Sequence, residues 1–304
     1  MPVNKRARQN KQSGQWLVMA AAVFWGTTGT AQAFAPDGAQ PSSVGAVRLI
    51  VGGFTLLLFA ALRGAFRGQK QWLSRATITA AVCIALYQLC FFAGVARTGV
   101  AAGTIVAIGS APIFAGLIGL PVHGERPGWR WGIATTLAVL GCAFLIADSG
   151  ELRVNLSGIL LALGAGLAYA TYAVASKRLL EKQPPEAAMA IVFSLGAVLL
   201  LPVLVTSDLT WIAKPRGLGV ALHLGLVTTA IAYILFSRGL KLIPVATAVT
   251  LSLAEPLTAA LLGLVVLGEQ HTPLALGGIG LILSGLFTLS VNQVIFHKPS
   301  GMPN

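Results

Sequence analysis

Charged residues are scarce in this 304-residue chain, since Asp, Glu, Lys and Arg make up only 10% of it and just nine residues are acidic. Soluble domains carry about 25% charged residues, so the composition excludes a soluble globular protein. Apolar residues make up 56% of the chain, and the mean hydropathy is +0.80. No polar stretch is long enough to form a soluble domain beside a single anchor, which indicates that most of the chain lies in a membrane.

Cysteine and histidine are also few, with three Cys and four His. Cys83, Cys90 and Cys142 fall inside apolar runs, where thiols behave as small hydrophobic side chains rather than metal ligands. Common hydrolase motifs are missing, including His-Glu-x-x-His, Gly-x-Ser-x-Gly and paired aspartates within an apolar run. We therefore expect no enzyme activity, no metal site and no cofactor.

The net charge of +12 does not indicate a nucleic-acid partner, because the basic residues lie in short intervals between apolar runs. A membrane-spanning helix needs about 20 apolar residues. Cutting the sequence at charges and at Pro/Gly/Ser clusters gives ten runs of this kind. The runs cover residues 16–35, 43–62, 76–96, 98–121, 130–147, 156–177, 187–205, 217–237, 243–267 and 273–293.

The distribution of basic residues predicts the orientation of these ten runs. With a cytoplasmic N-terminus, sixteen of the 21 Lys and Arg residues face the cytoplasm and four face outside, while Arg48 lies within the second run. This asymmetry is what the positive-inside rule requires. We expect both termini to be cytoplasmic, with a basic tail at residues 1–15 and a second tail at 294–304.

Two segments that lie 144 residues apart share eight of fourteen residues, namely 112–125 and 256–269, and each runs from Pro to Gly-Glu. This similarity predicts two copies of one unit, at residues 16–150 and 151–293. Each copy contains five spans, and an odd number means that the second copy crosses the membrane in the opposite direction. The predicted fold is an all-α integral membrane protein of ten transmembrane helices in two inverted five-helix repeats.

Inverted-repeat transporters bind substrate near the midplane, where helices are interrupted. Pro112 and Pro256 are the predicted helix breaks, because Pro removes a backbone donor and frees a carbonyl one turn earlier. Polar backbone groups at this depth require protein or a water-filled cavity around them. The alternative is that both prolines only bend their helices.

Five aromatic residues depart from the usual enrichment of Trp and Tyr at the membrane interfaces, because they lie well inside predicted spans. Tyr169 and Tyr172 share one helix face at a spacing of three, as do Tyr87 and Phe91 at a spacing of four. These rings are candidates for an aromatic cage around a planar or cationic substrate. The alternative is helix packing, with the hydroxyl groups bonded to backbone carbonyls. The candidate cage consists of Trp25, Tyr87, Phe91, Tyr169, Tyr172 and Tyr233.

Polar residues on the same spans extend the candidate lining, although Ser and Thr also join membrane helices to one another. Glu255 is the one acidic residue well inside a predicted span. Its carboxylate is a candidate for proton coupling, for contact with a substrate amino group, or for binding backbone donors at the break before Pro256. Arg48 lies near the outer boundary, where snorkelling to the headgroups is favoured slightly over a partnership with Glu255. The remaining candidates are Thr28, Gln88, Ser110 and Ser252.

The paired Pro…Gly-Glu pattern, the Arg early in the second span and the Glu-Pro of the ninth span together resemble the EamA family of the drug/metabolite transporter superfamily. The chain is most similar to its ten-helix bacterial exporters of the YddG type, which carry aromatic amino acids. One difference is that Ala111 in the first copy corresponds to Glu255 in the second. The resemblance implies export across the bacterial inner membrane through a central cavity lined by spans 1, 3, 4, 6, 8 and 9.

The expected partners are therefore a small-molecule substrate and the lipid bilayer, without nucleic acid or an obligate protein partner. Amino acids, including aromatic ones, are the expected substrates of an alternating-access exporter. The alternative is an exporter of multiple drugs or cationic toxicants, which would use the same aromatic lining without a substrate carboxylate. A membrane scaffold or passive pore is a further alternative from another class.

Overall fold

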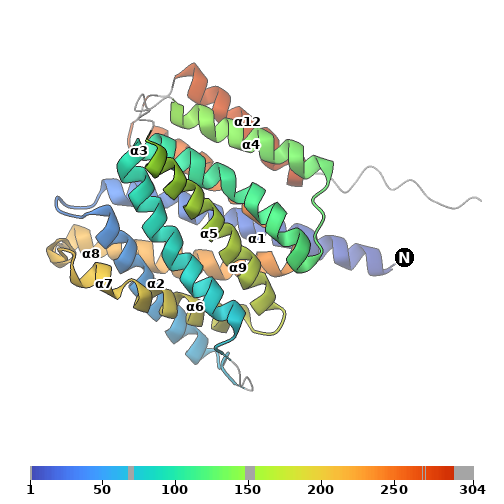
Figure 1. Ribbon diagram of the computed structural model, residues 1–304, viewed down its shortest axis with the longest axis horizontal. Coiled ribbons are helices and arrows are strands. Elements are labelled where there is room, and N and C mark those ends of the chain that lie inside the picture. The colour runs from blue at the N-terminus through green and yellow to red at the C-terminus, as the bar shows by residue number, and fades with distance from the viewer. Residues whose placement is uncertain (1, 68–71, 148–154, 269, 271, 291–304) are drawn as a thin grey trace, which may run out of the picture.

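The computed structural model describes residues 2–67, 72–147, 155–268, 270 and 272–290. Within these ranges the chain forms helices and their connections, without a β-strand (Figure 1). The helices are α1 (Pro2–Ala33), α2 (Pro41–Leu62), α3 (Arg75–His123), α4 (Trp129–Ala147), α5 (Leu156–Leu180), α6 (Pro185–Leu199), α7 (Leu201–Val205), η1 (Thr210–Ala213), α8 (Pro215–Leu222), the π-helix η2 (His223–Ile231), α9 (Ala232–Leu242), α10 (Val245–Leu251), α11 (Ala254–Val266) and α12 (Pro273–Ser290).

Seven helical segments of the described chain are long and apolar enough to cross a membrane. Two more apolar helices, in α4 and α6, are shorter. Helix α1, which is not among these nine, is long, but Lys5, Arg6 and Arg8 fall in its first turns. The prediction of an all-helical membrane protein is confirmed. Its count of ten crossings stays a prediction, because length and composition alone support seven. These seven are Ser42–Leu62, Arg75–Gly99, Gly103–His123, Leu156–Leu180, Pro215–Leu242, Val245–Val266 and Pro273–Ser290.

Local sequence signals account for where the helices begin and end. Ser74 caps α3 through a reciprocal capping box with Thr77, and the Asn155 side chain accepts hydrogen bonds from the first backbone N–H groups of α5. Gly124 ends α3 in the left-handed conformation, with φ 67°. Gly99 interrupts the same helix, because its φ of 84° and ψ of 159° are not helical. This interruption separates the two predicted spans that α3 contains.

The helices pack in pairs that combine the two halves of the chain. Helix α1 packs against α9 and α11, α3 against α5, α2 against α6, and α4 against α12. The α4–α12 pair lies along one edge of the molecule (Figure 1). There a Cβ atom added to Gly141 would lie 2.6 Å from the Gly278 carbonyl oxygen, and one added to Gly285 would lie 2.6 Å from that of Ala134. Residue numbers rise along one helix as they fall along the other, so α4 and α12 run antiparallel.

The two prolines predicted as helix breaks behave differently. Pro112 lies inside α3, which continues past it, so the prediction of a break there is wrong. At Pro256 the helix is interrupted just before the proline, at Ser252 and Leu253 between α10 and α11. The carbonyl of Ser252, which Pro256 deprives of its usual helical donor, accepts the Glu255 N–H at 2.9 Å. Only the second proline therefore marks a discontinuous span.

Candidate functional site

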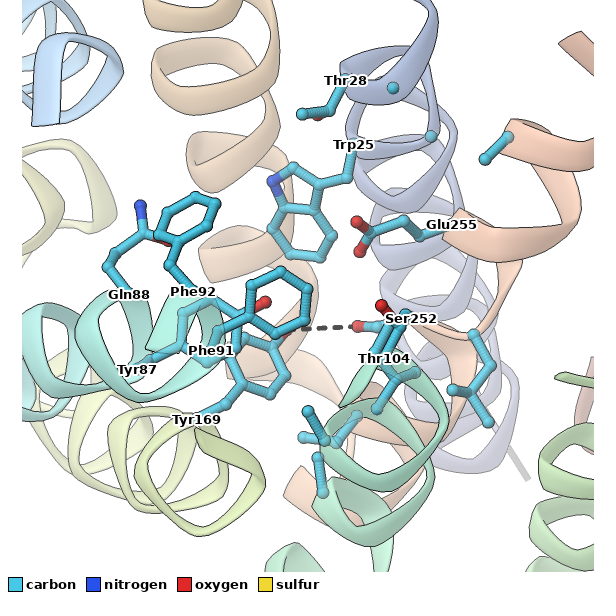
Figure 2. Close-up of a pocket in the computed structure, with 18 of the residues that line it drawn as sticks. Trp25, Thr28, Tyr87, Gln88, Phe91, Phe92, Thr104, Tyr169, Ser252 and Glu255 are labelled. Atoms are coloured by element: carbon cyan, nitrogen blue, oxygen red, sulfur yellow. Dashed lines mark hydrogen bonds between the residues drawn. The ribbon is translucent and has the colours of Figure 1, made fainter. Parts of the chain in front are cut away.

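A cavity of about 220 Å³ lies between helices from both halves of the chain. Its wall includes Trp25 from α1, Tyr87 from α3, Tyr169 from α5 and Glu255 from α11, whose side chains approach one another in Figure 2. At about 30 Å³ per water molecule, the cavity holds roughly seven waters, which suits a small metabolite. Along α1 the lining extends from Trp25 to Gln32.

The structure brings nine of the eleven predicted binding residues to this cavity. They come from five helices and from the interruption before α11. The nine are Trp25, Thr28, Tyr87, Gln88, Phe91, Tyr169, Tyr233, Ser252 and Glu255.

Aromatic rings form much of the lining. The ring centroids of Trp25 and Tyr233 lie 4.9 Å apart, and those of Tyr87 and Tyr169 lie 5.6 Å apart. Phe91 stacks on Tyr87 with centroids 5.7 Å apart. These centroid distances fall within the 4.5 to 7 Å range of favourable aromatic pairs, so the rings stabilise one another's positions in the wall. The Tyr169 hydroxyl meets the Ser252 hydroxyl at 3.4 Å (Figure 2).

Two predicted binding residues do not reach the cavity. Tyr172 is fully buried, donates a hydrogen bond to the Met189 sulfur at 3.4 Å, and packs edge-on against Phe193 of α6. Ser110 points at α5, where its hydroxyl lies 2.2 Å from the position of a Cβ on Gly166. It donates to the Ala107 carbonyl at 3.3 Å. Tyr172 therefore packs between helices, as in the alternative considered for it, although its hydroxyl bonds to a sulfur and not to a backbone carbonyl. Ser110 packs against α5 but bonds within its own helix.

Two opposite charges face the same cavity. Arg48 lines it from α2 and Glu255 from α11, although the sequence favoured a headgroup contact for Arg48. Arg48 lies close enough to act electrostatically on Glu255 and on the Tyr233 hydroxyl. Its Nε atom is buried without a hydrogen-bond partner in the described chain, as is the indole Nε1 of Trp25. Both of these unpartnered donors belong to residues of the cavity wall.

Sequence reasoning missed several lining residues besides Arg48. Gln32, Phe92 and Thr104 reach the cavity from α1 and from the two parts of α3. Arg48 carried a usable signal, because a charge inside an apolar span is costly unless it has a function. Gln32 and Thr104 lie near the ends of predicted spans, where polar residues are ordinary, so their sequence positions gave no comparable signal.

A polar network lies at the end of the molecule opposite Gln32. Lys177 Nζ donates to Glu125 Oε1 at 2.5 Å and to the Ile243 carbonyl at 2.6 Å. The Val245 N–H donates to Glu125 Oε2 at 2.7 Å. Lys177 lies about 12 Å along α5 from Tyr169, at 1.5 Å per residue. The network thus connects α5, the segment after α3 and the α9–α10 connection beyond one end of the cavity.

The fold and the cavity define a class of protein, namely multi-pass membrane transporters whose substrate site lies between two bundles of helices. The EamA-like transporter family model matches residues 12–147 and again residues 156–291. Because the two matches cover most of the chain, the protein belongs to the EamA-like transporter family. The resemblance to this family within the drug/metabolite transporter superfamily is confirmed.

Individual relatives agree with this assignment. The chain is 48% identical over 274 residues to the uncharacterized transporter YwfM of Bacillus subtilis, covering 90% of this chain and 92% of that one. It is 26% identical to a probable terminal-alkyne amino-acid exporter of Streptantibioticus cattleyicolor, covering 95% and 97%. The threonine/homoserine exporter RhtA of Escherichia coli is 35% identical over 164 residues, covering 52% and 54%. A crystal structure with 21% identity superposes with a TM-score of 0.80 over 91% of this chain and 96% of that one, which shows the shared fold.

Proposed function

We propose that this protein exports amino acids and related small metabolites across the bacterial inner membrane by alternating exposure of the central cavity. The observation that carries the proposal is a cavity of metabolite size whose lining of aromatic and polar side chains comes from both halves of the chain. The names of two relatives, which specify amino-acid export, support the substrate class. Aromatic amino acids belong to the proposed range because planar side chains would stack on the rings.

We further propose ten crossings in two inverted repeats, 16–150 and 151–293, with the tails 1–15 and 294–304 in the cytoplasm. The glycine contacts between α4 and α12 support this arrangement. The two contacts are Gly141 with Gly278 and Gly285 with Ala134. In the 144-residue repeat, Gly141 corresponds to Gly285 and Ala134 to Gly278. Each contact therefore has the other as its equivalent in the opposite half. Equivalent helices that meet antiparallel are what a twofold axis in the membrane plane produces.

In this orientation the Gln32 end of the cavity faces outside and the Glu125–Lys177 network faces the cytoplasm. The described conformation would then be one in which the cytoplasmic end is closed. The rival function is export of cationic toxicants. Such a substrate could contact Glu255 and the aromatic rings but would leave Arg48 without a counter-charge.

Transport of a panel of labelled amino acids into proteoliposomes, with and without a pH gradient, tests the proposed function. We expect uptake that competes with unlabelled amino acids and is accelerated by amino acid on the opposite side, because a carrier exchanges substrates whereas a static pore does not. Competition by quaternary amines but not by amino acids would favour the toxicant exporter. Absence of transport for the whole panel would refute the proposal.

Removing single rings from the cavity should slow transport more than it lowers protein abundance. Trp25→Ala, Tyr87→Ala and Tyr169→Ala should each reduce the transport rate about two- to tenfold, because an aromatic contact contributes about 0.5–1.5 kcal/mol. Trp72→Ala is the matched control, because Trp72 does not line the cavity. Its ring instead packs against that of Phe66, with the two centroids 5.2 Å apart. Rates should be normalised to the amount of folded protein in the vesicles. Unchanged rates in all three variants would contradict the aromatic cage.

A further inference from the structure

We propose that Arg48 and Glu255 bind the two charged groups of a zwitterionic α-amino acid, Arg48 the carboxylate and Glu255 the ammonium group. The inference rests on the proposed function and specifies how the cavity recognises its substrate. It assigns one charged residue to each half of the chain, since Arg48 lies on α2 and Glu255 on α11.

The two charges face one cavity without neutralising each other directly. Both side chains are partly buried and line the same space. The charge of Arg48 acts on Glu255, yet the ion pairs found among the described residues do not join them. Opposite charges inside a membrane protein usually pair with one another. Because Arg48 and Glu255 line one cavity without forming an ion pair, each is free to contact a charged group of a ligand held there.

A zwitterion satisfies both charges at once. Its carboxylate and ammonium groups are attached to the same carbon atom, so one small molecule brings a counter-charge to each residue. With both side chains ionised, the net charge of the site is zero before and after such a ligand binds, which limits the cost of placing charges at this depth. A cationic or anionic ligand would instead leave one of the two protein charges uncompensated.

The unpartnered donors favour the carboxylate on the side of Arg48 and Trp25. Arg48 Nε and Trp25 Nε1 are both buried without an acceptor in the described chain, and Trp25 is only 4% exposed. A carboxylate accepts several hydrogen bonds, and a guanidinium can hold it through two. In Figure 2 the indole nitrogen of Trp25 points away from the Glu255 carboxylate, so this donor and this acceptor face different parts of the cavity.

Glu255 supplies the acceptor side. Across the part of the chain that the structure describes, no hydrogen bond reaches its carboxylate, although its backbone N–H is bonded to Ser252. Binding of backbone donors at the break, one function considered for this residue, is therefore not what the described structure shows. With its charges held, the ligand would direct its side chain toward Tyr87 and Phe91, whose stacked rings accept flat or branched apolar groups.

Binding of blocked ligands to purified protein in lipid nanodiscs tests the assignment. The probes are L-threonine and L-phenylalanine, the methyl ester of each, and the N-acetyl form of each, with affinity measured by calorimetry. Each blocked form should bind wild-type protein about 10- to 100-fold more weakly than the free amino acid, because a charged hydrogen bond contributes about 1.5–3 kcal/mol. Arg48→Gln should weaken binding of the free amino acid by a similar factor, and the variant should bind the free amino acid and its methyl ester equally. Glu255→Gln should bind the free amino acid and its N-acetyl form with equal affinity.

Controls separate this inference from the proposed function. Arg97→Gln, which removes a cation that contacts Ser157 outside the cavity, should keep both preferences. If Arg48→Gln does not fold, Arg48→Lys should keep the preference for the free acid over the ester. Wild-type protein that binds amino acids and their blocked forms equally would overturn the assignment while leaving amino-acid export intact. Wild-type protein that binds none of a full panel of amino acids would refute the proposed function itself.

Discussion

Lys177→Met should lower the free energy of unfolding by about 3 kcal/mol, because it leaves the largely buried Glu125 carboxylate without its counter-charge. The two side chains are only 17% and 13% exposed, and their charged atoms lie 2.5 Å apart. The substitution keeps a long apolar side chain, so little packing is lost. It also frees the Ile243 carbonyl, which accepts from Lys177 at 2.6 Å. Denaturant titration in mixed micelles, followed by tryptophan fluorescence, measures the change.

Two further variants make this prediction specific. Adding Glu125→Gln to Lys177→Met should restore part of the lost stability, because the double variant leaves no buried charge and Gln can still accept from the Val245 N–H. Glu186→Gln should lower the free energy of unfolding by less than about 1 kcal/mol. Its partner Arg238 is 45% exposed, so solvent screens the ion pair. Equal losses in Lys177→Met and Glu186→Gln would show that the buried network does not stabilise the fold more than a surface ion pair.

Seven of the predicted spans and most of the cavity-lining rings followed from the sequence because each carries a local signal. An apolar run of about 20 residues specifies a membrane helix whatever surrounds it. Trp25, Tyr87 and Tyr169 were identified because aromatic residues with polar groups are unusual at mid-span and need partners there. The structure places all three on the wall of one cavity.

Residues whose surroundings depend on distant helices could not be placed in this way. Tyr172 lies three residues after Tyr169, a rotation of about 60° at 3.6 residues per turn, and that rotation turns it from the cavity toward Phe193. Arg48 lies close enough to a predicted boundary for snorkelling, and only the position of α2 against the other half shows that it lines the cavity. Pro112 does not interrupt its helix, although Pro256 in the related segment follows an interruption.

The two halves also differ at positions where the sequence repeat does not predict a difference. The position that corresponds to Lys177 is Ala33, so the first half has no equivalent lysine. The second half contains the π-helix η2, in which the Thr228 and Thr229 hydroxyls both donate to the Leu224 carbonyl at 2.8 Å. π-Helical turns are rare and frequent at functional sites. The π-helix η2 ends next to the first turn of α9, which carries Tyr233. This difference between the two halves therefore lies beside the cavity and not at the α4–α12 pair.

At that outer pair, Gly141→Ala and Gly285→Ala should each lower the free energy of unfolding by about 1–3 kcal/mol, the usual cost of overpacking a tight contact. Each new Cβ would lie 2.6 Å from a backbone oxygen of the opposite helix, and a backbone atom cannot move aside as the end of a side chain can. Because the two contacts are related by the offset of 144 residues, the two losses should be similar in size. Thermal unfolding in detergent, monitored by tryptophan fluorescence, compares the variants.

Gly132 on α4 and Gly277 on α12 provide matched controls, because a Cβ at either position would meet no heavy atom within 4 Å apart from the neighbouring backbone of its own helix. Gly132→Ala and Gly277→Ala should leave stability unchanged or raise it by up to about 1 kcal/mol, since Ala favours a helix over Gly. The contrast between the two pairs isolates the backbone contact from helix propensity. If all four variants behave alike, the close approach of α4 and α12 is not a stabilising contact. If only one of Gly141→Ala and Gly285→Ala is destabilised, the two halves do not meet there as equivalent copies.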